Sequence, residues 1–328
     1  MFFKEEKQLP LPRKNKHSMR ILPHLVALAT VAVWGSTFVY TKLLLLAGLS
    51  AAQIFTLRFI IAYVLLLAFS ILQKRGTPFR LLSASWRDEL LMVALGVSGG
   101  SLYFLTENSS MNYTTTTNTS LIVCMCPLFA AALIGLFYKN QRLHGLQILG
   151  SVMASLGVVI VVLNGRFVLH LSPLGDTLAF VACLCWVVYS LLMIPASQRY
   201  DTLFITRKVF FYGLISLLPY YLVYPSWPPI ALILRPDVLF NLLFLGCVAS
   251  MLCFLAWNWA IRRLGAVTVT NYAYFNPVVT MLFAWIILSE RITIFFVVGT
   301  ILILVGMYLT NNPSFARGLK DTGLISRE

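Results

Sequence analysis

The hydrophobic pattern of the chain is a succession of long apolar runs separated by short polar gaps. A helix needs roughly 20 consecutive apolar residues to cross a bilayer. Nine runs without a charged residue approach or exceed that length, namely 21–41, 90–106, 108–138, 143–165, 177–198, 209–234, 238–261, 264–289 and 292–316. A tenth run, 51–72, contains one charge, Arg58. We therefore predict an all-α integral membrane protein with ten transmembrane helices.

The composition supports this class and excludes others. Hydrophobic residues make up 59% of the chain and charged residues only 11%, whereas soluble domains carry about 25% charged residues. The net charge of +14 does not indicate nucleic-acid binding, because the basic residues lie in gaps between apolar runs. The six cysteines lie within apolar runs and the four histidines are dispersed, so we expect no metal site and no cofactor. The expected partners are the lipid bilayer and a small-molecule substrate.

Basic residues divide unequally between the two sets of connections. Eighteen Lys and Arg residues fall on the side of the N-terminus, and three (Arg166, Arg235 and Arg291) fall on the other side. Cytoplasmic loops of membrane proteins are enriched in Lys and Arg. We therefore predict a multi-pass protein of the cell membrane (inner or plasma membrane) with both termini cytoplasmic, a basic tail at 1–21 and a second tail at 311–328.

The two halves of the chain align with each other at an offset of about 150 residues. At this offset Pro127 falls on Pro277 without a gap. The alignment defines a first repeat at 22–163 and a second at 173–310, with five predicted helices in each. Because five is an odd number, the second repeat is inserted upside down relative to the first. Inverted repeats are typical of secondary transporters, which bind their substrate near the bilayer midplane.

Several short motifs accompany the repeat. They are Trp-Gly-Ser-Thr-Phe at 34–38, Arg-Phe at 58–59, Ser-Glu-Arg-Ile-Thr at 289–293, and the later Gly299 and Gly306, which the first half repeats as Gly150 and Gly157. With these motifs the chain resembles, over about residues 22–310, the drug/metabolite transporter superfamily in its EamA-like branch. The first half departs from the family in having Gln141 where a glutamate is usual. The resemblance implies ten helices, a central cavity and alternating access, often with export of metabolites or drugs.

Charged residues inside predicted helices are the first candidates for a site, because each costs about 2.5–3.5 kcal/mol on insertion scales. Arg58 lies in the second predicted helix, and Lys208 falls on it at the offset of 150. Arg58 either binds substrate or has a structural partner, and Lys208 either faces the cavity or extends to the cytoplasmic surface. Glu107 either pairs with Arg58 or Lys42 or carries a proton, so proton coupling stays open.

Uncharged polar and aromatic residues complete the predicted cavity. Two polar stretches at equivalent places in the repeats each end at a proline, Pro127 or Pro277, which would kink the helix beside a wet space. The candidate substrate-binding residues are Trp34, Tyr40, Arg58, Tyr103, Glu107, Asn118, Trp186, Tyr189, Lys208, Asn271, Tyr274 and Asn276.

These features indicate a secondary transporter that moves small metabolites across the cytoplasmic membrane by alternating access, with export favoured. A buried cation favours zwitterions or anions, above all amino acids, as substrates. The alternatives are a membrane-embedded lipid-modifying enzyme, a non-transporting membrane protein, or a carrier of drug cations, sugar phosphates or nucleotide sugars. The sequence has no nucleotide-binding loop and no nucleophile elbow, so we do not predict an enzyme. The choice between monomer and homodimer stays open.

Overall fold

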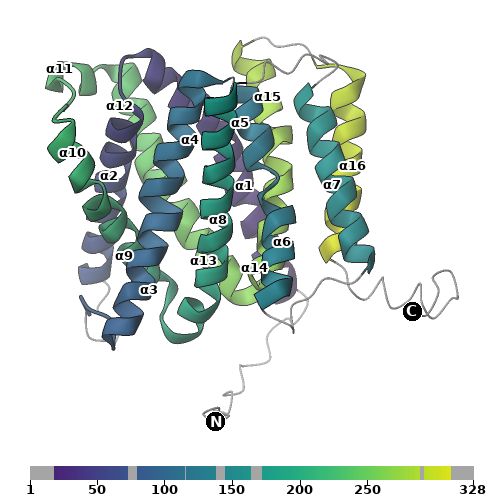
Figure 1. Cartoon of the computed structure of the whole chain (residues 1–328), viewed down its shortest axis with the longest axis horizontal. Coiled ribbons are helices and arrows are strands. Elements are labelled where there is room, and N and C mark those ends of the chain that lie inside the picture. Colours follow the sequence, from purple (N-terminus) through teal and green to yellow (C-terminus); the bar gives the residue numbers. More distant parts are fainter. Residues whose placement is uncertain are drawn as a thin grey trace, which may run out of the picture.

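Helices make up all the regular secondary structure in the described part of the chain. The computed structural model describes residues 18–72, 80–114, 116–137, 145–163, 172–288 and 292–311. The helices pack side by side in a bundle with broadly aligned axes (Figure 1). The helices are α1 (Ser18–Leu46), α2 (Ala51–Leu72), α3 (Trp86–Gly96), α4 (Leu102–Tyr113), α5 (Thr116–Val123), α6 (Cys126–Phe137), α7 (Gly145–Leu163), α8 (Pro173–Arg199), α9 (Thr202–Ser216), α10 (Leu218–Val223), α11 (Ile230–Ile233), α12 (Pro236–Leu243), α13 (Cys253–Leu264), α14 (Ala266–Thr270), α15 (Asn276–Leu288) and α16 (Ile294–Asn311).

Seven helical stretches of the described residues are long and apolar enough to cross a bilayer. They are Ile21–Leu46, Ala51–Leu72, Trp86–Tyr113, Gly145–Leu163, Pro173–Arg199, Thr202–Val223 and Pro236–Leu264. Two shorter apolar helices cover Thr119–Leu133 and Ile294–Thr310. The chain is therefore a multi-pass membrane protein.

Several predicted spans have the wrong ends; the run 90–106, for example, lies within one helical stretch that covers Trp86–Tyr113. The run 108–138 is not one helix, because α4 continues to Tyr113 before α5 begins. The run 209–234 is also not one helix, since α9 ends at Ser216 and the chain turns before Pro219. A charge-free run locates apolar surface, whereas a helix end depends on local caps and on proline, which lacks the N–H for the next helical hydrogen bond.

The helices that contain Pro127 and Pro277 are both interrupted just before the proline. α5 ends at Val123, and α6 begins one residue before Pro127. In the second half a 3₁₀ segment, η4 (Asn271–Phe275), separates α14 from α15, and Pro277 is the second residue of α15. Residues at both breaks, such as Cys124 and Asn271, are buried, so protein groups rather than lipid surround the interrupted backbone.

Two π-helical segments also occur at equivalent places in the two halves. η1 (Val97–Ser101) joins α3 to α4, and η3 (Phe244–Leu252) joins α12 to α13. Adding the offset of 150 moves 97–101 to 247–251, which lies inside η3. η1 packs against α9, and η3 packs against α2. π-Helical turns are rare and often occur at functional sites.

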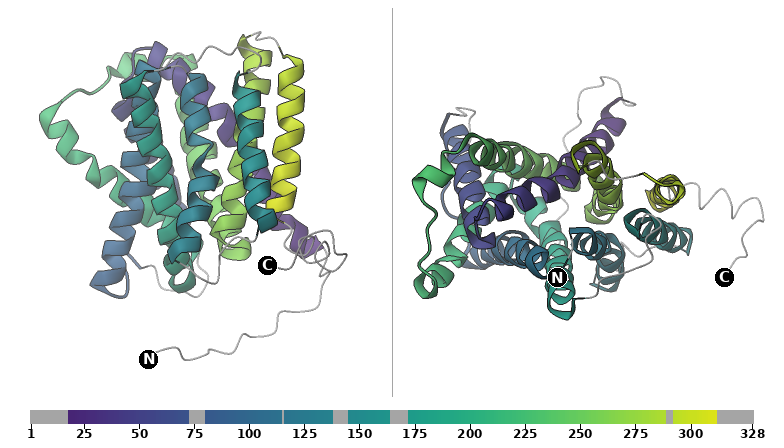
Figure 2. Two further views of the ribbon diagram at one scale, coloured as in Figure 1. Left: turned by 45° about the vertical axis from the view of Figure 1, so that its right-hand side comes forward. Right: turned by 90° about the horizontal axis from the view of Figure 1, so that it is seen from above.

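Each half of the chain contributes its first helix to the other half. α1 runs through the middle of the bundle (Figure 2) and packs mainly on α13, α15 and η4 of the second half. α8 packs in the same way on α4, α5 and α6 of the first half. This exchange brings Trp34 of α1 and Trp186 of α8 together at the centre, with ring centroids 5.4 Å apart.

α7 and α16 pack along each other at one edge of the bundle (Figure 2). A Cβ atom added at Gly306 would lie 2.5 Å from the carbonyl oxygen of Gly150, and one added at Gly157 would lie 2.7 Å from that of Gly299. Backbone therefore contacts backbone at both points. Small residues permit such close approach, which is a main source of helix association in lipid.

This contact predicts the effect of a larger side chain. We expect Gly306→Val to lower the free energy of unfolding by about 1–3 kcal/mol, because the new atoms meet backbone that cannot turn aside. Thermal unfolding in detergent measures the change. Gly145→Val is the matched control, because a Cβ at Gly145 meets nothing within 4 Å. Equal melting temperatures for the two variants would contradict the close contact.

Candidate functional site

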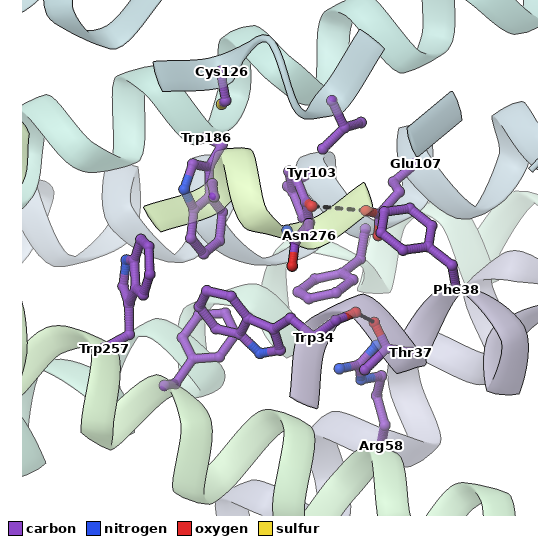
Figure 3. A pocket seen from close by; sticks show the side chains of 14 residues that line it. Trp34, Thr37, Phe38, Arg58, Tyr103, Glu107, Cys126, Trp186, Trp257 and Asn276 are labelled. Carbon is purple, nitrogen blue, oxygen red and sulfur yellow. Dashed lines mark hydrogen bonds between the residues drawn. The ribbon is translucent and has the colours of Figure 1, made fainter. Parts of the chain in front are cut away.

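A small cavity lies at the centre of the bundle, where α1, α2, α4, α8, α13 and the η4–α15 junction meet (Figure 3). It is lined by Trp34, Thr37, Phe38, Arg58, Tyr103, Phe104, Glu107, Val123, Cys126, Trp186, Phe254, Trp257, Ala273 and Asn276. The cavity has a volume of about 40 Å³, which is room for a few water molecules. A substrate of metabolite size therefore requires the walls to move apart.

Three tryptophans form the apolar wall of the cavity. The ring centroids of Trp34 and Trp257 are 4.9 Å apart, and those of Trp186 and Trp257 are 6.2 Å apart. The indole Nε1–H of Trp34 donates to the carbonyl oxygen of Ala249 at 2.9 Å. Ala249 belongs to η3, so the π-helical segment supplies the acceptor that fixes the central ring.

Arg58 is buried in the cavity wall without an ionic partner. Its side chain is 2% exposed, and its Nε–H donates to the hydroxyl of Ser250 at 2.9 Å. Its guanidinium carbon lies 4.5 Å from the centre of the Phe104 ring. Among the described residues no carboxylate oxygen lies within 4.0 Å of its nitrogens, and its two terminal nitrogens have no protein acceptor. Four N–H groups of a cation are thus left for a ligand.

Glu107 contributes the opposite charge to the same cavity. It is 7% exposed, and its Oε1 accepts a hydrogen bond of 2.7 Å from the hydroxyl of Tyr103, one turn earlier on α4 (Figure 3). It forms no ion pair with Arg58 or with Lys42 at the 4.0 Å limit. The ammonium of Lys42 instead donates to the carbonyl oxygen of Met111 at 3.1 Å. Neither predicted ion-pair partner therefore binds Glu107.

Lys208, the repeat counterpart of Arg58, lies outside the cavity and is paired. It is 3% exposed and binds Oε1 of Glu89 on α3. The hydroxyl of Tyr212 donates to the same oxygen, and the backbone N–H of Ser83 donates to Oε2 at 2.7 Å. The two cations at equivalent positions therefore differ, since Lys208 is neutralised by protein and Arg58 is not.

A second acidic side chain connects the same end of α3 to α8. Asp88 pairs with the guanidinium of Arg199 at 2.5 Å and accepts a hydrogen bond of 2.9 Å from the hydroxyl of Tyr200. Its backbone N–H donates to the hydroxyl of Ser85, which caps α3. Together with the Glu89–Lys208 pair, this cluster holds α3, α8 and α9 together at one end of the bundle.

The structure brings half of the predicted binding residues into one cavity. Six of the twelve line it, namely Trp34, Arg58, Tyr103, Glu107, Trp186 and Asn276. The side chain of Asn118 lies outside the described part of the structure. Asn271 is buried but does not line the cavity.

Three predicted aromatic residues also lie beyond the cavity lining. The ring of Tyr40 packs on Phe244 with centroids 4.5 Å apart. The hydroxyl of Tyr189 donates to Oδ1 of Asn258 at 2.7 Å. The hydroxyl of Tyr274 accepts a 3.4 Å hydrogen bond from Ser155. Tyr189 still supports the site, because its ring packs on Trp186 with centroids 5.1 Å apart.

Sequence analysis did not identify the partners of the two buried cations, Glu89 for Lys208 and Ser250 for Arg58. Glu89 was assigned to a connection, because the predicted span began at the next residue, yet it pairs with Lys208 inside the helical region. Ser250 was not singled out, although it is the hydrogen-bond partner of Arg58. The useful signal for Glu89 was the sequence Ser85-x-x-Asp88, which marks a helix start before that residue.

A bundle of membrane-crossing helices around a cavity with charged walls is the architecture of a membrane carrier, and comparison with known proteins agrees. A sequence model of the EamA-like transporter family matches residues 21–163 and again residues 173–312. A protein named "Uncharacterized transporter" from Archaeoglobus fulgidus is 30% identical over 292 residues, covering 88% of this chain and 96% of its own length. The chain belongs to the EamA-like transporter family, and it is a transporter and not an enzyme.

Other similar proteins carry more specific names. A "Probable amino-acid metabolite efflux pump" from Escherichia coli is 25% identical over 301 residues, covering 87% of this chain and 93% of its own length. A "Probable terminal-alkyne amino-acid exporter" from Streptantibioticus cattleyicolor is 26% identical over 230 residues, covering 70% and 75%. One solved crystal structure matches with a TM-score of 0.72 at 16% identity, covering 88% of this chain and 97% of that chain. This chain and that crystal structure are similar in fold.

The Glu89–Lys208 pair predicts a particular pattern of stability. Glu89→Gln and Lys208→Met should each lower the free energy of unfolding by about 3 kcal/mol. This value is at the lower end of the range for breaking a buried ion pair, because 21% of the Glu89 side chain is exposed. The double variant should recover most of that loss, since neither charge is then unpaired. Denaturation in detergent measures all three.

Asp237→Asn is the control for this cycle, because Asp237 and its partner Arg235 are both exposed and should contribute little. Simple addition of the two single effects in the double variant would rule out direct coupling between Glu89 and Lys208.

Proposed function

We propose that this protein is a secondary transporter that exports small zwitterionic or anionic metabolites, amino acids above all, across the cell membrane by alternating access. The observation that carries the proposal is the cavity in which Arg58 and Glu107 both lie buried without forming an ion pair with each other. An amino acid supplies a carboxylate for the first and an ammonium for the second. The names of two relatives, an amino-acid metabolite efflux pump and an amino-acid exporter, support the same substrate class and the direction.

The electrostatics favour this class over permanent cations. An unpaired guanidinium out of water is costly, and a carboxylate ligand relieves that cost through charge-assisted hydrogen bonds, often two in parallel. A drug cation would meet the same guanidinium as a like charge, with Glu107 alone to compensate. A sugar phosphate carries more negative charge than one arginine balances, and Lys208 is already paired with Glu89.

We also propose ten membrane-crossing helices in two inverted repeats, 22–163 and 173–310, between two cytoplasmic tails, 1–21 and 311–328. Two matches of one family model, one per half, support the duplication. Two more observations support a two-fold axis between the halves. The first observation is that the first helix of each half packs mainly on helices of the other half.

The glycines of α7 and α16 supply the second observation. In the alignment Gly150 corresponds to Gly299 and Gly157 to Gly306, but the contacts are Gly150 with Gly306 and Gly157 with Gly299. Such exchanged partners are what a two-fold axis produces at an interface. Trp34 and Trp186, which align at an offset of 152, touch each other, as residues beside the axis would.

The small size of the cavity supports alternating access. At about 40 Å³ it is far smaller than a ligand pocket, typically about 300–1,000 Å³, so we interpret the conformation as contracted. The cluster of Glu89, Lys208, Asp88 and Arg199 holds the α3 end together and would have to loosen when that end opens. Because this end carries the basic residues, we assign it to the cytoplasm.

Glu107 is our candidate for proton coupling. In the described structure its carboxyl has one hydrogen-bond donor, Tyr103, and no cation within 4.0 Å, so a proton is the simplest neutralising partner when no substrate is bound. Arrival of an ammonium group would displace that proton. The carrier would then exchange protons for amino acids. Both a monomer and a homodimer are compatible with this mechanism, because the cavity lies within one chain.

The topology has a direct test. Single cysteines introduced at Lys74 and Arg235, in a background without native cysteines, should react with a membrane-impermeant maleimide from opposite sides, the first only after the cytoplasmic face is exposed. The expectation rests on the unequal distribution of Lys and Arg. Labelling of both sites from the same side would rule out the ten-helix topology.

The substrate class is tested by Arg58→Gln in proteoliposomes loaded with a mixture of radiolabelled amino acids. We expect efflux to fall by roughly 10- to 100-fold, because a charge-assisted hydrogen bond contributes about 1.5–3 kcal/mol. Arg263→Gln, on an exposed arginine of α13, should leave efflux unchanged. In the same vesicles an imposed pH gradient should accelerate efflux by the wild type but not by Glu107→Gln.

Transport of quaternary ammonium drugs without any amino-acid efflux would overturn the proposed substrate class. Undiminished efflux by a correctly inserted Arg58→Gln variant would show that the arginine is structural.

A further inference from the structure

Two polar atoms in the cavity wall are buried and have no hydrogen-bond partner. They are the indole Nε1 of Trp257 and the amide Oδ1 of Asn276, both within the described part of the chain. The side chain of Trp257 is 0% exposed and that of Asn276 is 9% exposed. A buried polar group that lacks a partner costs about 1–3 kcal/mol. Orphaned atoms on a binding-cavity wall therefore point to a group that the ligand supplies.

The other uncharged polar groups of the wall are already engaged. Trp34 donates to Ala249, the hydroxyl of Thr37 donates to the Trp34 carbonyl oxygen at 2.7 Å, and the thiol of Cys126 donates to the Cys183 carbonyl oxygen at 3.1 Å. The hydroxyl of Tyr103 is held by Glu107. What is left for a ligand is the charged pair, one indole donor at Trp257 and the side-chain amide of Asn276, whose buried Oδ1 is an acceptor without a donor.

These groups lie at different places in the cavity. Figure 3 shows Arg58 and Glu107 at one end of the set of side chains and Trp257 at the other, with Asn276 between them. If the charged end binds the ammonium and carboxylate of an amino acid, the side chain of that amino acid extends along Asn276 toward the three tryptophans. The side chain then meets one acceptor and one donor in an otherwise aromatic wall.

We propose that Trp257 and Asn276 select amino acids whose side chain ends in a group that both donates and accepts hydrogen bonds, a hydroxyl or a primary amide. This inference rests on the proposed function and names a subset of its substrates. A short side chain donates from its hydroxyl or amide to Asn276 Oδ1, and a longer one reaches Trp257 Nε1–H and accepts from it. A hydrocarbon side chain of the same size leaves both atoms unpaired.

The discrimination follows from the cost of that unpaired state. A site built to hydrogen-bond a polar group rejects an analogue that lacks the group far more strongly than an apolar site distinguishes two hydrocarbons. The aromatic rings supply apolar contact to both kinds of side chain, so the preference depends on the two polar atoms. Trp257 and Asn276 are on this account specificity-determining residues, separate from the charged groups that bind the common part of the substrate.

The experiment compares side chains of matched shape. Proteoliposomes are loaded with equal concentrations of threonine and valine, asparagine and leucine, and tyrosine and phenylalanine, and the efflux of each is followed by amino-acid analysis. Protein-free liposomes give the passive leak to subtract. In the wild type we expect the polar member of at least one pair to leave at least ten times faster than its apolar partner. The ratio within a pair does not depend on how much active protein each preparation contains.

Two variants test whether the polar-to-apolar efflux ratio depends on Trp257 Nε1 and Asn276 Oδ1. Trp257→Phe keeps an aromatic ring and removes the N–H, and Asn276→Leu keeps the shape and removes the acceptor. Each should lower the polar-to-apolar ratio at least threefold, mainly by slowing the polar member. Trp227→Phe is the matched control, since Trp227 is 54% exposed and does not line the cavity.

The possible failures are distinguishable. Efflux of all six amino acids with ratios near one in the wild type would overturn the selectivity and leave the proposed function intact. A wild-type preference that survives in every variant that elutes as a folded protein would assign the selectivity to other residues and overturn the inference. No efflux of any amino acid would overturn the proposed function, and the inference with it.

Discussion

The hydrocarbon core of a bilayer offers no hydrogen-bond partner to the backbone, and this constraint governs where the chain can depart from a regular helix. The helices are irregular at four places, and each place packs against other helices of the bundle. These places are the break after Val123, the 3₁₀ segment Asn271–Phe275, and the π-helical segments η1 and η3. The interior of the bundle is thus the place where backbone groups are available. Trp34 uses one of them, the carbonyl of Ala249 in η3, to fix its ring in the cavity wall. The irregular backbone therefore lies beside the cavity, where protein groups rather than lipid surround it.

The same constraint makes every buried charge need a partner, and the two halves meet that need differently. Lys208 has Glu89, whereas the residue 150 positions after Glu89 is Leu239, so the counterpart of that acid is absent near Arg58. Arg58 instead donates one hydrogen bond to the neutral hydroxyl oxygen of Ser250. Of the two cations at equivalent positions of the two halves, one is therefore paired inside the protein and the other lies in the cavity wall.

The sequence was informative wherever a property is local. Apolar runs predicted the helical class, because insertion into lipid demands uninterrupted apolar surface. The single charge in the run 51–72 drew attention to Arg58 before any contact was known. Pairings across long distances could not be derived. Glu89 and Lys208 are 119 residues apart, and nothing near either residue identifies the other. Tyr40 and Tyr274 failed to reach the cavity lining for a related reason, since which face of a helix turns inward depends on neighbours that the local pattern does not name.

The backbone contact between α7 and α16 has a mechanical consequence. At Gly150, Gly157, Gly299 and Gly306 backbone meets backbone, so changes of side-chain rotamer cannot alter the spacing of the two helices at these points. α7 and α16 therefore form one close pair at the edge of the bundle, and neither helix lines the cavity. In the proposed transport cycle this pair would stay together while the helices around the cavity move, so the last helix of each half would provide rigidity without touching the substrate.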